Sequence, residues 1–148
     1  MFRGANLLTV DAKGRIAVPA RYRQTLTEMC GGQLVMTVDQ ARCLLLYPLP
    51  TWAEIEKKLQ QLPAYDRNAR RLQRFLVGHA TELEMDRQGR VLVPQVLRDF
   101  AGIDRRAMLV GQINKFELWD ETAWDAQWQE PPGEDDFDLP EGFASLTL

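Results

Sequence analysis

The sequence lacks the features of an exported or membrane-spanning protein. Its longest apolar run, residues 44–47, ends at Pro48, whereas a transmembrane helix needs about 18 apolar residues or more. The N-terminus has no signal-peptide core, because Asp11 interrupts the apolar stretch too early. The two cysteines, Cys30 and Cys43, form neither a C-x-x-C pair nor a metal-ligand spacing. We therefore expect a cytoplasmic protein whose cysteines are reduced, buried thiols.

The sequence also has few residues of the kinds that carry out catalysis. His79 is its only histidine, and no serine or cysteine nucleophile stands at a recognisable motif spacing from it. Glu82, Glu84 and Asp86 alternate with apolar residues, which favours the solvated face of a half-buried strand over a metal or acid/base site. There is no phosphate-binding loop, dinucleotide fingerprint or zinc pattern. The sequence therefore predicts no catalytic residues, metal, cofactor or small-molecule substrate.

Charge is unevenly distributed along the chain. The 148 residues carry a formal net charge of −3, and this balance by itself disfavours a polyanionic partner. However, the segment 129–148 has six acidic side chains and no basic one, whereas the segment 1–23 has five basic side chains and one acidic one. We interpret the segment 129–148, which is also rich in proline and glycine, as a flexible acidic tail. The rest of the chain, from Met1 to Trp128, is basic overall, at +3.

One motif occurs twice, once near the N-terminus and once in the second half of the chain. Asp-Ala-Lys-Gly-Arg-Ile-Ala-Val-Pro at residues 11–19 returns as Asp-Arg-Gln-Gly-Arg-Val-Leu-Val-Pro at residues 86–94. Further pairs follow in the same order: Arg23 with Arg98, Leu34-Val35 with Leu109-Val110, Tyr47 with Trp119, and Trp52 with Trp124. The two members of each of the last two pairs are fewer residues apart than the members of the earlier pairs. This difference places a longer hairpin loop in the first copy, around residues 39–43. The chain therefore contains two copies of one unit.

The residue pattern of each copy predicts the same order of strands and helices, which is typical of an α+β fold. A short strand ends at the Asp-x-x-Gly turn, a second strand ends at a proline, and a helix follows over residues 20–29 or 95–101. Glycines at 31–32 and 102 should end these helices. Hairpins should then pair 34–38 with 44–47 and 107–111 with 116–119, each leading into a helix that contains a tryptophan. Residues 66–77, between the copies, have the composition of a further helix.

The repeated Asp-x-x-Gly-Arg segment has the chemistry of a tight turn that positions an arginine. The aspartate can bond the backbone two residues on, and the glycine tolerates a positive φ. Arg15 or Arg90 then leaves the turn from a fixed backbone, which suits bidentate recognition of a phosphate or a guanine. The alternative is a local ion pair between Asp11 and Arg15, or Asp86 and Arg90, that only holds a hairpin together. Two cationic loops at equivalent positions favour a binding surface.

A second basic feature lies between the copies. The spacing of Arg67, Arg70, Arg71 and Arg74 places them on one face of a helix. This face is either a second contact for nucleic acid, a basic seam between subunits, or a solvated face paired with neighbouring acids, which is the interpretation we favour. The four tryptophans are expected to be core or interface anchors: Trp52, Trp119, Trp124 and Trp128.

Several segments together resemble the MraZ family. They are the opening Met-Phe-Arg-Gly, both Asp-x-x-Gly-Arg loops, Leu-Tyr-Pro at 46–48, Val-Gly-His-Ala at 77–80 and Lys-Phe-Glu-Leu-Trp at 115–119. The resemblance extends from Met1 to about Trp128. It implies a swapped-hairpin β-barrel, related to AbrB-type DNA-binding domains, with short peripheral helices. The two SpoVT-AbrB-like repeats are expected at 1–53 and 81–128, with connecting helices at 54–80 and the acidic tail at 129–148.

The resemblance also implies a function and partners. Members of this family assemble into homo-oligomeric rings and bind tandem direct repeats in double-stranded DNA. These repeats lie upstream of the bacterial division and cell-wall gene cluster, which begins with the family's own gene, and the proteins act mainly as repressors. This chain would then be a nucleoid-associated cytoplasmic regulator and not an enzyme or a membrane protein. The alternative is a ring-forming scaffold whose basic loops bind an acidic protein partner.

The DNA-binding element that the resemblance implies is the Asp-x-x-Gly-Arg loop. Asp11 and Asp86 are expected to form the turns. The expected DNA-binding residues are Arg3, Lys13, Gly14, Arg15, Arg87, Gln88, Gly89 and Arg90. Arg15 should read base edges and Arg90 should do so more weakly, whereas Arg3, Lys13 and Arg87 should hold phosphates.

Overall fold

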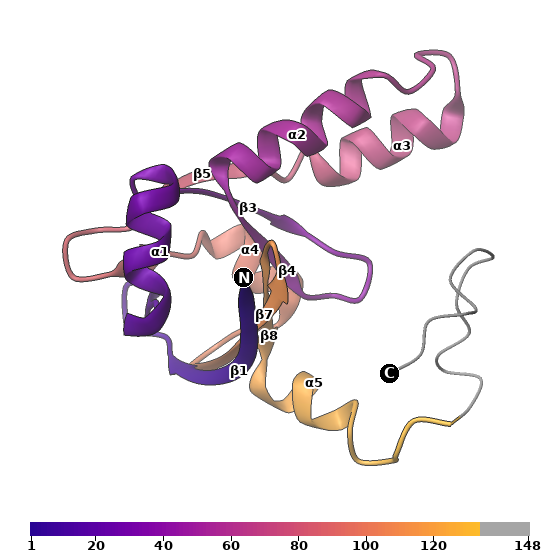
Figure 1. Cartoon of the computed structure of the whole chain (residues 1–148). Coiled ribbons are helices and arrows are strands. Elements are labelled where there is room, and N and C mark those ends of the chain that lie inside the picture. The colour runs from indigo at the N-terminus through magenta and orange to yellow at the C-terminus, as the bar shows by residue number, and fades with distance from the viewer. Residues whose placement is uncertain (134–148) are drawn as a thin grey trace.

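The computed structural model describes residues 1–133, which fold into two antiparallel sheets and five helices (Figure 1). The strands are β1 (Phe2–Thr9), β2 (Arg15–Ala17), β3 (Gln33–Val38), β4 (Leu44–Pro48), β5 (Thr81–Glu84), β6 (Arg90–Leu92), β7 (Arg106–Ile113) and β8 (Phe116–Asp120). The helices are α1 (Ala20–Cys30), α2 (Leu49–Gln60), α3 (Arg67–Leu76), α4 (Gln95–Ala101) and α5 (Glu121–Ala126). The predicted α+β class is confirmed. Most of the predicted acidic tail, residues 134–148, lies outside the described residues.

The two copies exchange their first strands. The six-stranded sheet has the order β1-β7-β8-β4-β3-β5, in which β1 of the first copy pairs with β7 of the second, and β5 of the second pairs with β3 of the first. The order is unchanged when each strand is replaced by its counterpart in the other copy and the sheet is read from the opposite end. The short strands β2 and β6 pair with each other as a separate ribbon. Neither copy could form these pairs alone.

The closed barrel that the resemblance implied is not seen in residues 1–133. β1 and β5 are the two edges of the six-stranded sheet, and no described strand joins them. After Val10 and Met85, whose N–H groups make the last bonds to segments of the other copy, the chain turns into the two Asp-x-x-Gly loops. The strands that follow, β2 and β6, pair with each other in the ribbon and not with the edges of the large sheet. Within each loop, the N–H group of the glycine bonds back to the carbonyl of the aspartate. The hairpin exchange is therefore present, but the sheet is open.

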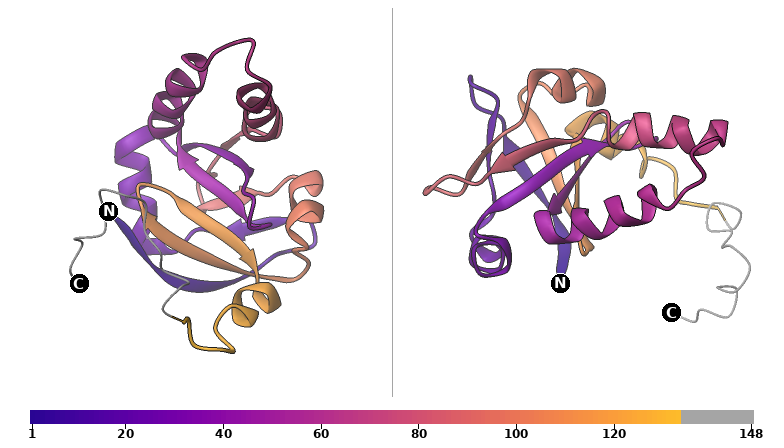
Figure 2. Two further views of the ribbon diagram at one scale, coloured as in Figure 1. Left: turned by 90° about the vertical axis from the view of Figure 1, so that its right-hand side faces the viewer. Right: turned by 90° about the horizontal axis from the view of Figure 1, so that it is seen from above.

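Helix boundaries follow the predicted signals closely. α1 and α4 begin directly after Pro19 and Pro94, and they end at Gly31 and Gly102, which are both left-handed, with φ of 62° and 67°. The helix predicted between the copies is α3, whose first turn is capped by the Asp66 carboxylate accepting from the backbone of the second helical residue. α2 and α3 form a hairpin that projects away from the sheets (Figures 1 and 2). No helix in residues 1–133 is long and apolar enough to cross a membrane.

The main hydrophobic core lies between the concave face of the sheet, the ribbon, α1 and α4. Its fully buried side chains include Ile16 and Val91 from the ribbon and Leu109 and Leu118 from the sheet. A smaller cluster on the other face of the sheet is covered by Trp52 of α2. The tryptophan at 128, two residues beyond α5, is 50% exposed and therefore not part of the core of the single chain. The proposed boundaries at 53/54, 80/81 and 128/129 stay a prediction; the first of them falls inside α2.

Candidate nucleic-acid interface

The first loop is held together by the side chain of Asp11. Its Oδ1 accepts hydrogen bonds from the backbone N–H groups of Lys13 and Arg15, at 2.9 and 2.8 Å, and its Oδ2 accepts from Nε of Arg15 at 2.8 Å. Gly14 has a φ of 89°, and its N–H closes the turn onto the Asp11 carbonyl at 2.9 Å. The hydrogen bond from the Arg15 N–H is the main cause that lowers the pKa of Asp11 to about 2.

The second loop repeats this geometry. Asp86 accepts from the backbone N–H groups of Gln88 and Arg90, at 2.9 and 2.8 Å, and from Nε of Arg90 at 3.2 Å. The hydrogen bond from the backbone N–H of Arg90 is again the largest cause that lowers the pKa of Asp86. Gly89 has a φ of 78°. The two loops therefore present Arg15 and Arg90 with the same local geometry.

The local ion pair that we considered as an alternative exists in both loops. In each, the arginine atom that bonds the carboxylate is Nε. The two terminal nitrogens of the guanidinium, Nη1 and Nη2, are not used by this pair. Those are the atoms that a guanidinium uses for bidentate contact with a guanine or a phosphate. The ion pair therefore orients each arginine without exhausting its hydrogen-bond donors.

Arg15 and Arg90 lie on one face of the ribbon. Arg15 is opposite Leu92, and Ala17 is opposite Arg90, so these four side chains point to the same side, since residues two apart and residues directly opposite share a face. Leu92 is 51% exposed. The intervening residues of the ribbon point inward and are fully buried in the core. The result is a narrow two-stranded surface with an arginine on each strand.

Each loop rests against the other copy. The Gly14 carbonyl accepts from Val93 N–H at 2.9 Å, and the Gly89 carbonyl accepts from Val18 N–H at 2.8 Å. Arg98 of α4 donates from Nε to the Val93 carbonyl at 3.0 Å. In the same way, Arg23 of α1 donates to the carbonyl of residue 18 at 2.6 Å. These two helical arginines support the loops. Their equivalent positions in the two copies are visible in the sequence, but this role is not.

The glycines in the loops are close to these supporting arginines. A Cβ added to Gly14 would lie 2.7 Å from the guanidinium carbon of Arg98, and one added to Gly89 would lie 2.2 Å from Nε of Arg23. Contacts this short cannot form without a shift of the neighbouring side chain. Both glycines are therefore favoured by their positive φ, and each lies against an arginine of the other copy that would have to shift to admit a Cβ.

The other expected contact residues occupy different elements. Lys13 and Arg87 are exposed at the tips of the first and second loops, one position apart in the repeat register. Arg3 is on β1 opposite Gln112 and belongs to neither loop. The backbone carbonyl of Arg3 accepts a hydrogen bond from the hydroxyl of Tyr22. The structure thus groups the cations of the two loops around one ribbon and places Arg3 on the edge strand of the large sheet.

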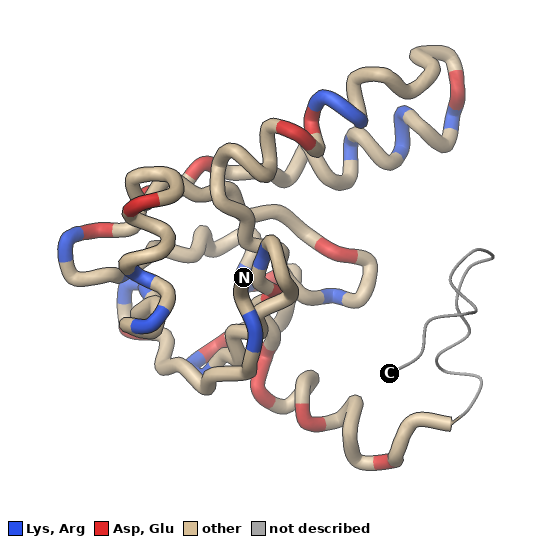
Figure 3. Tube along the Cα trace, in the orientation of Figure 1, with Lys and Arg blue, Asp and Glu red and all other residues tan. Residues whose placement is uncertain are grey.

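The basic face of α3 is far from this ribbon in the fold. Figure 3 shows its blue segments on the projecting hairpin, on the opposite side from the two loops. All four arginines at 67, 70, 71 and 74 are exposed. None of them makes an ion pair with a carboxylate of residues 1–133. The pairing with neighbouring acids that we favoured is therefore wrong for the described part of the chain.

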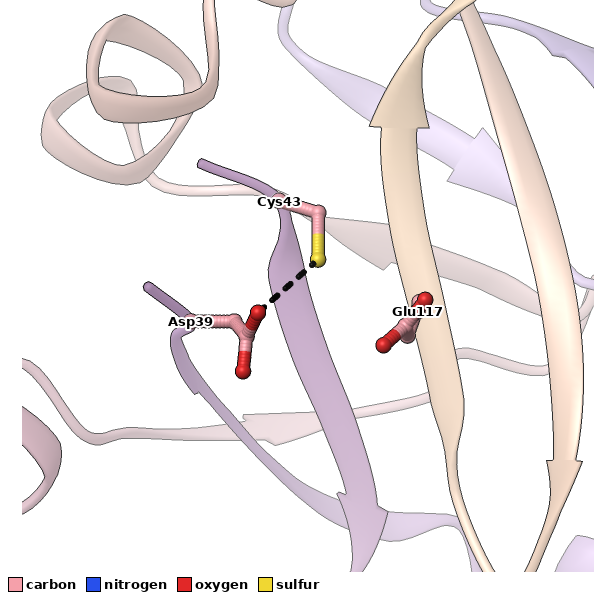
Figure 4. Close-up of side chains that lie close together, drawn as sticks. All are labelled: Asp39, Cys43 and Glu117. Carbon is pink, nitrogen blue, oxygen red and sulfur yellow. Dashed lines mark hydrogen bonds between the residues drawn. The ribbon is translucent and has the colours of Figure 1, made fainter. Parts of the chain in front are cut away.

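Asp39, Cys43 and Glu117 form a separate cluster on the outer face of the sheet (Figure 4). The thiol of Cys43 is fully buried and points at Asp39, with Sγ 3.8 Å from Oδ2. Burial raises the pKa of Cys43 most, and the carboxylates of Glu117 and Asp39 raise it further. Burial and the two carboxylates thus favour the protonated thiol, which donates to Asp39 within the fold. Both cysteines are free, as expected, although Cys30 is only half-buried.

His79 has structural contacts just beyond the end of α3. Its Nδ1 lies 2.7 Å from the carbonyl oxygen of Phe75, one of the last carbonyls of that helix. The imidazole also packs against the rings of Phe75 and Phe100, with centroids 5.8 and 6.1 Å away. These contacts match the packed or capping role predicted for the only histidine.

Comparison with known proteins matches the whole described chain. The family described as "MraZ protein, putative antitoxin-like" matches twice, over residues 1–75 and 76–141. A protein of Thioalkalivibrio sulfidiphilus (strain HL-EbGR7) named "Transcriptional regulator MraZ" is 60% identical over 124 residues, 84% of this chain and 83% of that protein. Proteins of the same name are 57% identical over 127 residues in Pseudomonas aeruginosa (strain LESB58), covering 85% and 84% of the two chains, and 51% identical over both full lengths in Halorhodospira halophila (strain DSM 244 / SL1).

Proposed function

The chain belongs to the MraZ family, whose members are not enzymes, and we propose that it is a sequence-specific DNA-binding transcriptional regulator. It binds tandem direct repeats upstream of the bacterial division and cell-wall gene cluster, including its own promoter, and acts mainly as a repressor. It works in the cytoplasm, associated with the nucleoid. The names of its relatives support the regulatory role, and the ribbon supports the contact with DNA.

The observation that carries this proposal is the exposed ribbon with one arginine on each strand. The major groove of B-DNA admits a two-stranded β-ribbon. In such a docking, Arg15 and Arg90 direct their free terminal nitrogens at base edges, where guanine offers two acceptors to a bidentate donor. Leu92 lies on the same face and provides an apolar surface suited to a thymine methyl group. Sequence reasoning did not identify Leu92, because its contact role depends on the pairing of β2 with β6.

The loop tips supply contacts of a different kind. Lys13 and Arg87 are exposed in the loops at opposite ends of the ribbon, which suits contact with the phosphates that border a groove. Arg3, on β1, is proposed as a further phosphate contact. Gly14, Gln88 and Gly89 shape the loops and allow the backbone to approach the duplex. Phosphate contacts strengthen binding to any sequence, whereas the two ribbon arginines distinguish sequences.

Several copies of the chain are proposed to act together as a ring-shaped homo-oligomer. One ribbon provides only a small contact surface, and single DNA-binding modules of this size bind weakly. A ring holds its ribbons at a fixed spacing, and tandem repeats offer matching sites at a fixed spacing. Engaging the second site is then an intramolecular event with a high effective concentration.

The test compares two substitutions in the same loop. Arg15→Ala should abolish the discrimination between repeat-containing and scrambled DNA, because it removes the base-reading donor. Lys13→Ala should weaken binding to both DNAs alike and reduce the slope of log K against log salt by about one. Lys58→Ala, an exposed cation on α2, is the matched control and should change neither. Fluorescence anisotropy at several salt concentrations measures all three; an Arg15→Ala variant that still discriminates would contradict the proposed role.

The same assay separates DNA binding from the scaffold alternative. A scaffold whose basic loops hold an acidic protein partner should bind any DNA weakly and lose it at physiological salt, because only non-specific electrostatics would act. A regulator should retain repeat-containing DNA at that salt.

A further inference from the structure

The α2–α3 hairpin carries an excess of positive charge that the described fold does not neutralise. It has six basic side chains against three acidic ones, and four of the basic ones are the arginines of α3. Like charges three and four residues apart repel one another on a helix. Because no carboxylate of residues 1–133 pairs with these arginines, the face is complementary to an anionic partner.

A hollow with two apolar lining residues lies next to this face of α3 and shares Arg71 with it. Gln40, Asn68, Arg71, Leu72 and Phe75 line a depression of about 330 Å³. Leu72 is 37% exposed although it is a large apolar side chain, and Phe75 is half-buried. A partner that fits this surface needs both negative charge and an apolar anchor. A phosphate backbone supplies only the charge.

The α3 face lies away from the two loops. In Figure 1 and in the right-hand view of Figure 2, the loops and the α2–α3 hairpin project from opposite sides of the fold. The α3 face is therefore a surface separate from the ribbon.

The chain itself contains a segment with the required chemistry. No lysine or arginine occurs after Lys115, and residues 134–141 read Glu-Asp-Asp-Phe-Asp-Leu-Pro-Glu. This segment places Phe137 and Leu139 among five carboxylates. Phe137 is only four residues beyond Gly133, whereas Phe143 is ten residues beyond it. Ten extended residues span about 34 Å, so Phe143 is the aromatic side chain of the segment with the longer reach.

We propose that the acidic C-terminal segment, residues 134–148 of this polypeptide, docks on the basic face of α3. Its carboxylates pair with Arg67, Arg70, Arg71 and Arg74, and Phe143 enters the hollow beside Leu72. Docking there holds the acidic segment on the side of the molecule opposite the loops. The segment then leaves the ribbon open to DNA, whereas an undocked acidic segment would compete for the same cations. This proposal does not depend on whether the loops bind DNA.

The test uses the full chain with a photoreactive benzoylphenylalanine at Phe143, without DNA. After irradiation, mass mapping should locate the cross-links on residues 67–76. The double variant Arg67→Gln/Arg71→Gln should reduce their yield about fivefold, because it removes two ion pairs. Raising the salt concentration should reduce the yield as well.

A matched double variant controls for the change in net charge. Arg105→Gln/Lys115→Gln removes two cations from the region of β7 and β8 and should leave the cross-links on α3 unchanged. Circular dichroism establishes that the variants keep their helices. Cross-links that map to residues 11–15 or 86–90, or an equal loss of yield in both double variants, would overturn the proposal.

Discussion

At the scale of single residues, the loops depend on two kinds of residue that cannot be exchanged freely. Asp11 and Asp86 each accept three hydrogen bonds from their own loop. Gly14 and Gly89 combine a positive φ with close approach of an arginine from the other copy. The hydrogen bonds of the aspartates lie within the loop and can be inferred from the sequence. The contact between each glycine and an arginine of the other copy can be recognised only when the position of the helix that carries the arginine is known.

Glycine substitutions separate these two requirements. Gly31 has a positive φ, but no atom lies within 4 Å of the Cβ that an alanine would add there. Gly31→Ala should therefore lower the free energy of unfolding by about 1 kcal/mol through backbone strain alone. Gly14→Ala has comparable strain and must also displace the Arg98 guanidinium, so it should cost about 2–3 kcal/mol. Chemical denaturation measures both values. Equal costs would mean that the arginine moves aside freely.

The lowered pKa of Asp11 predicts how the first loop responds to acid. A carboxyl whose folded pKa of about 2 lies below the ordinary value of 3.8 stabilises the folded loop above pH 4 and loses this effect as the pH falls to about 2. The NMR shifts of the Lys13 and Arg15 amides should therefore titrate with a midpoint near 2. Asp11→Asn, which keeps an oxygen acceptor, should remove this titration. A midpoint close to 3.8 would show that the hydrogen bonds are not kept in solution.

At the scale of elements, the functional surface is made where the copies meet. β2 and β6 come from different copies and form the ribbon together. α1 and α4 each place one arginine against the turn that follows the other copy's edge strand. The surface that carries Arg15 and Arg90 is thus formed by both copies, each of which contributes one strand, one loop and one helix.

Replacing Arg98 tests this exchange. Arg98→Met keeps the apolar stem but removes the bond to the Val93 carbonyl and the guanidinium beside Gly14. We expect a cost of about 1 kcal/mol in unfolding free energy and changed amide shifts at residues 13–15, in the first copy, although the substitution is in the second. Arg105→Met is the control. Changes confined to the second copy would contradict the proposed support.

At the scale of the whole molecule, the separation of its charged regions matters more than the net charge. The net charge of −3 disfavours a nucleic-acid partner, yet the ribbon and its loops are cationic. The acidic excess belongs to the C-terminal part of the sequence, where no basic residue follows Lys115. A second basic region, on α3, lies on the opposite side from the loops (Figure 3).

The length of the DNA tests the proposed cooperation between copies. Removing all but one direct repeat from the duplex should weaken binding about 10²-fold or more, because the effective concentration of the second site is lost. A duplex of the original length with the other repeats scrambled is the control for non-specific contacts. Anisotropy titrations at one fixed salt concentration compare the three duplexes. Equal affinity for one repeat and for several would show that copies bind independently.

Sequence patterns predicted individual elements better than their arrangement. The helix starts at Pro19 and Pro94 and the stops at Gly31 and Gly102 were correct because they depend on backbone chemistry within a few residues. The closed barrel was wrong, because alternation shows which side of a strand is buried but not whether its edge meets another edge. The pairing of the α3 arginines was wrong for a similar reason, since helical spacing does not show which acids lie nearby.

The sequence by itself determined the repeat, its elements and the internal structure of each loop. These follow from hydrogen bonds between residues at most four positions apart, such as those from Arg15 to Asp11. The exchange of strands was expected from the family resemblance and not from any local pattern, and the structure shows it. Only the tertiary structure decided that Arg15 and Arg90 share one ribbon face and that Arg98 supports Gly14. Those contacts join residues from opposite halves of the chain. They depend on which edges and side chains the packed core brings together, which no local pattern records.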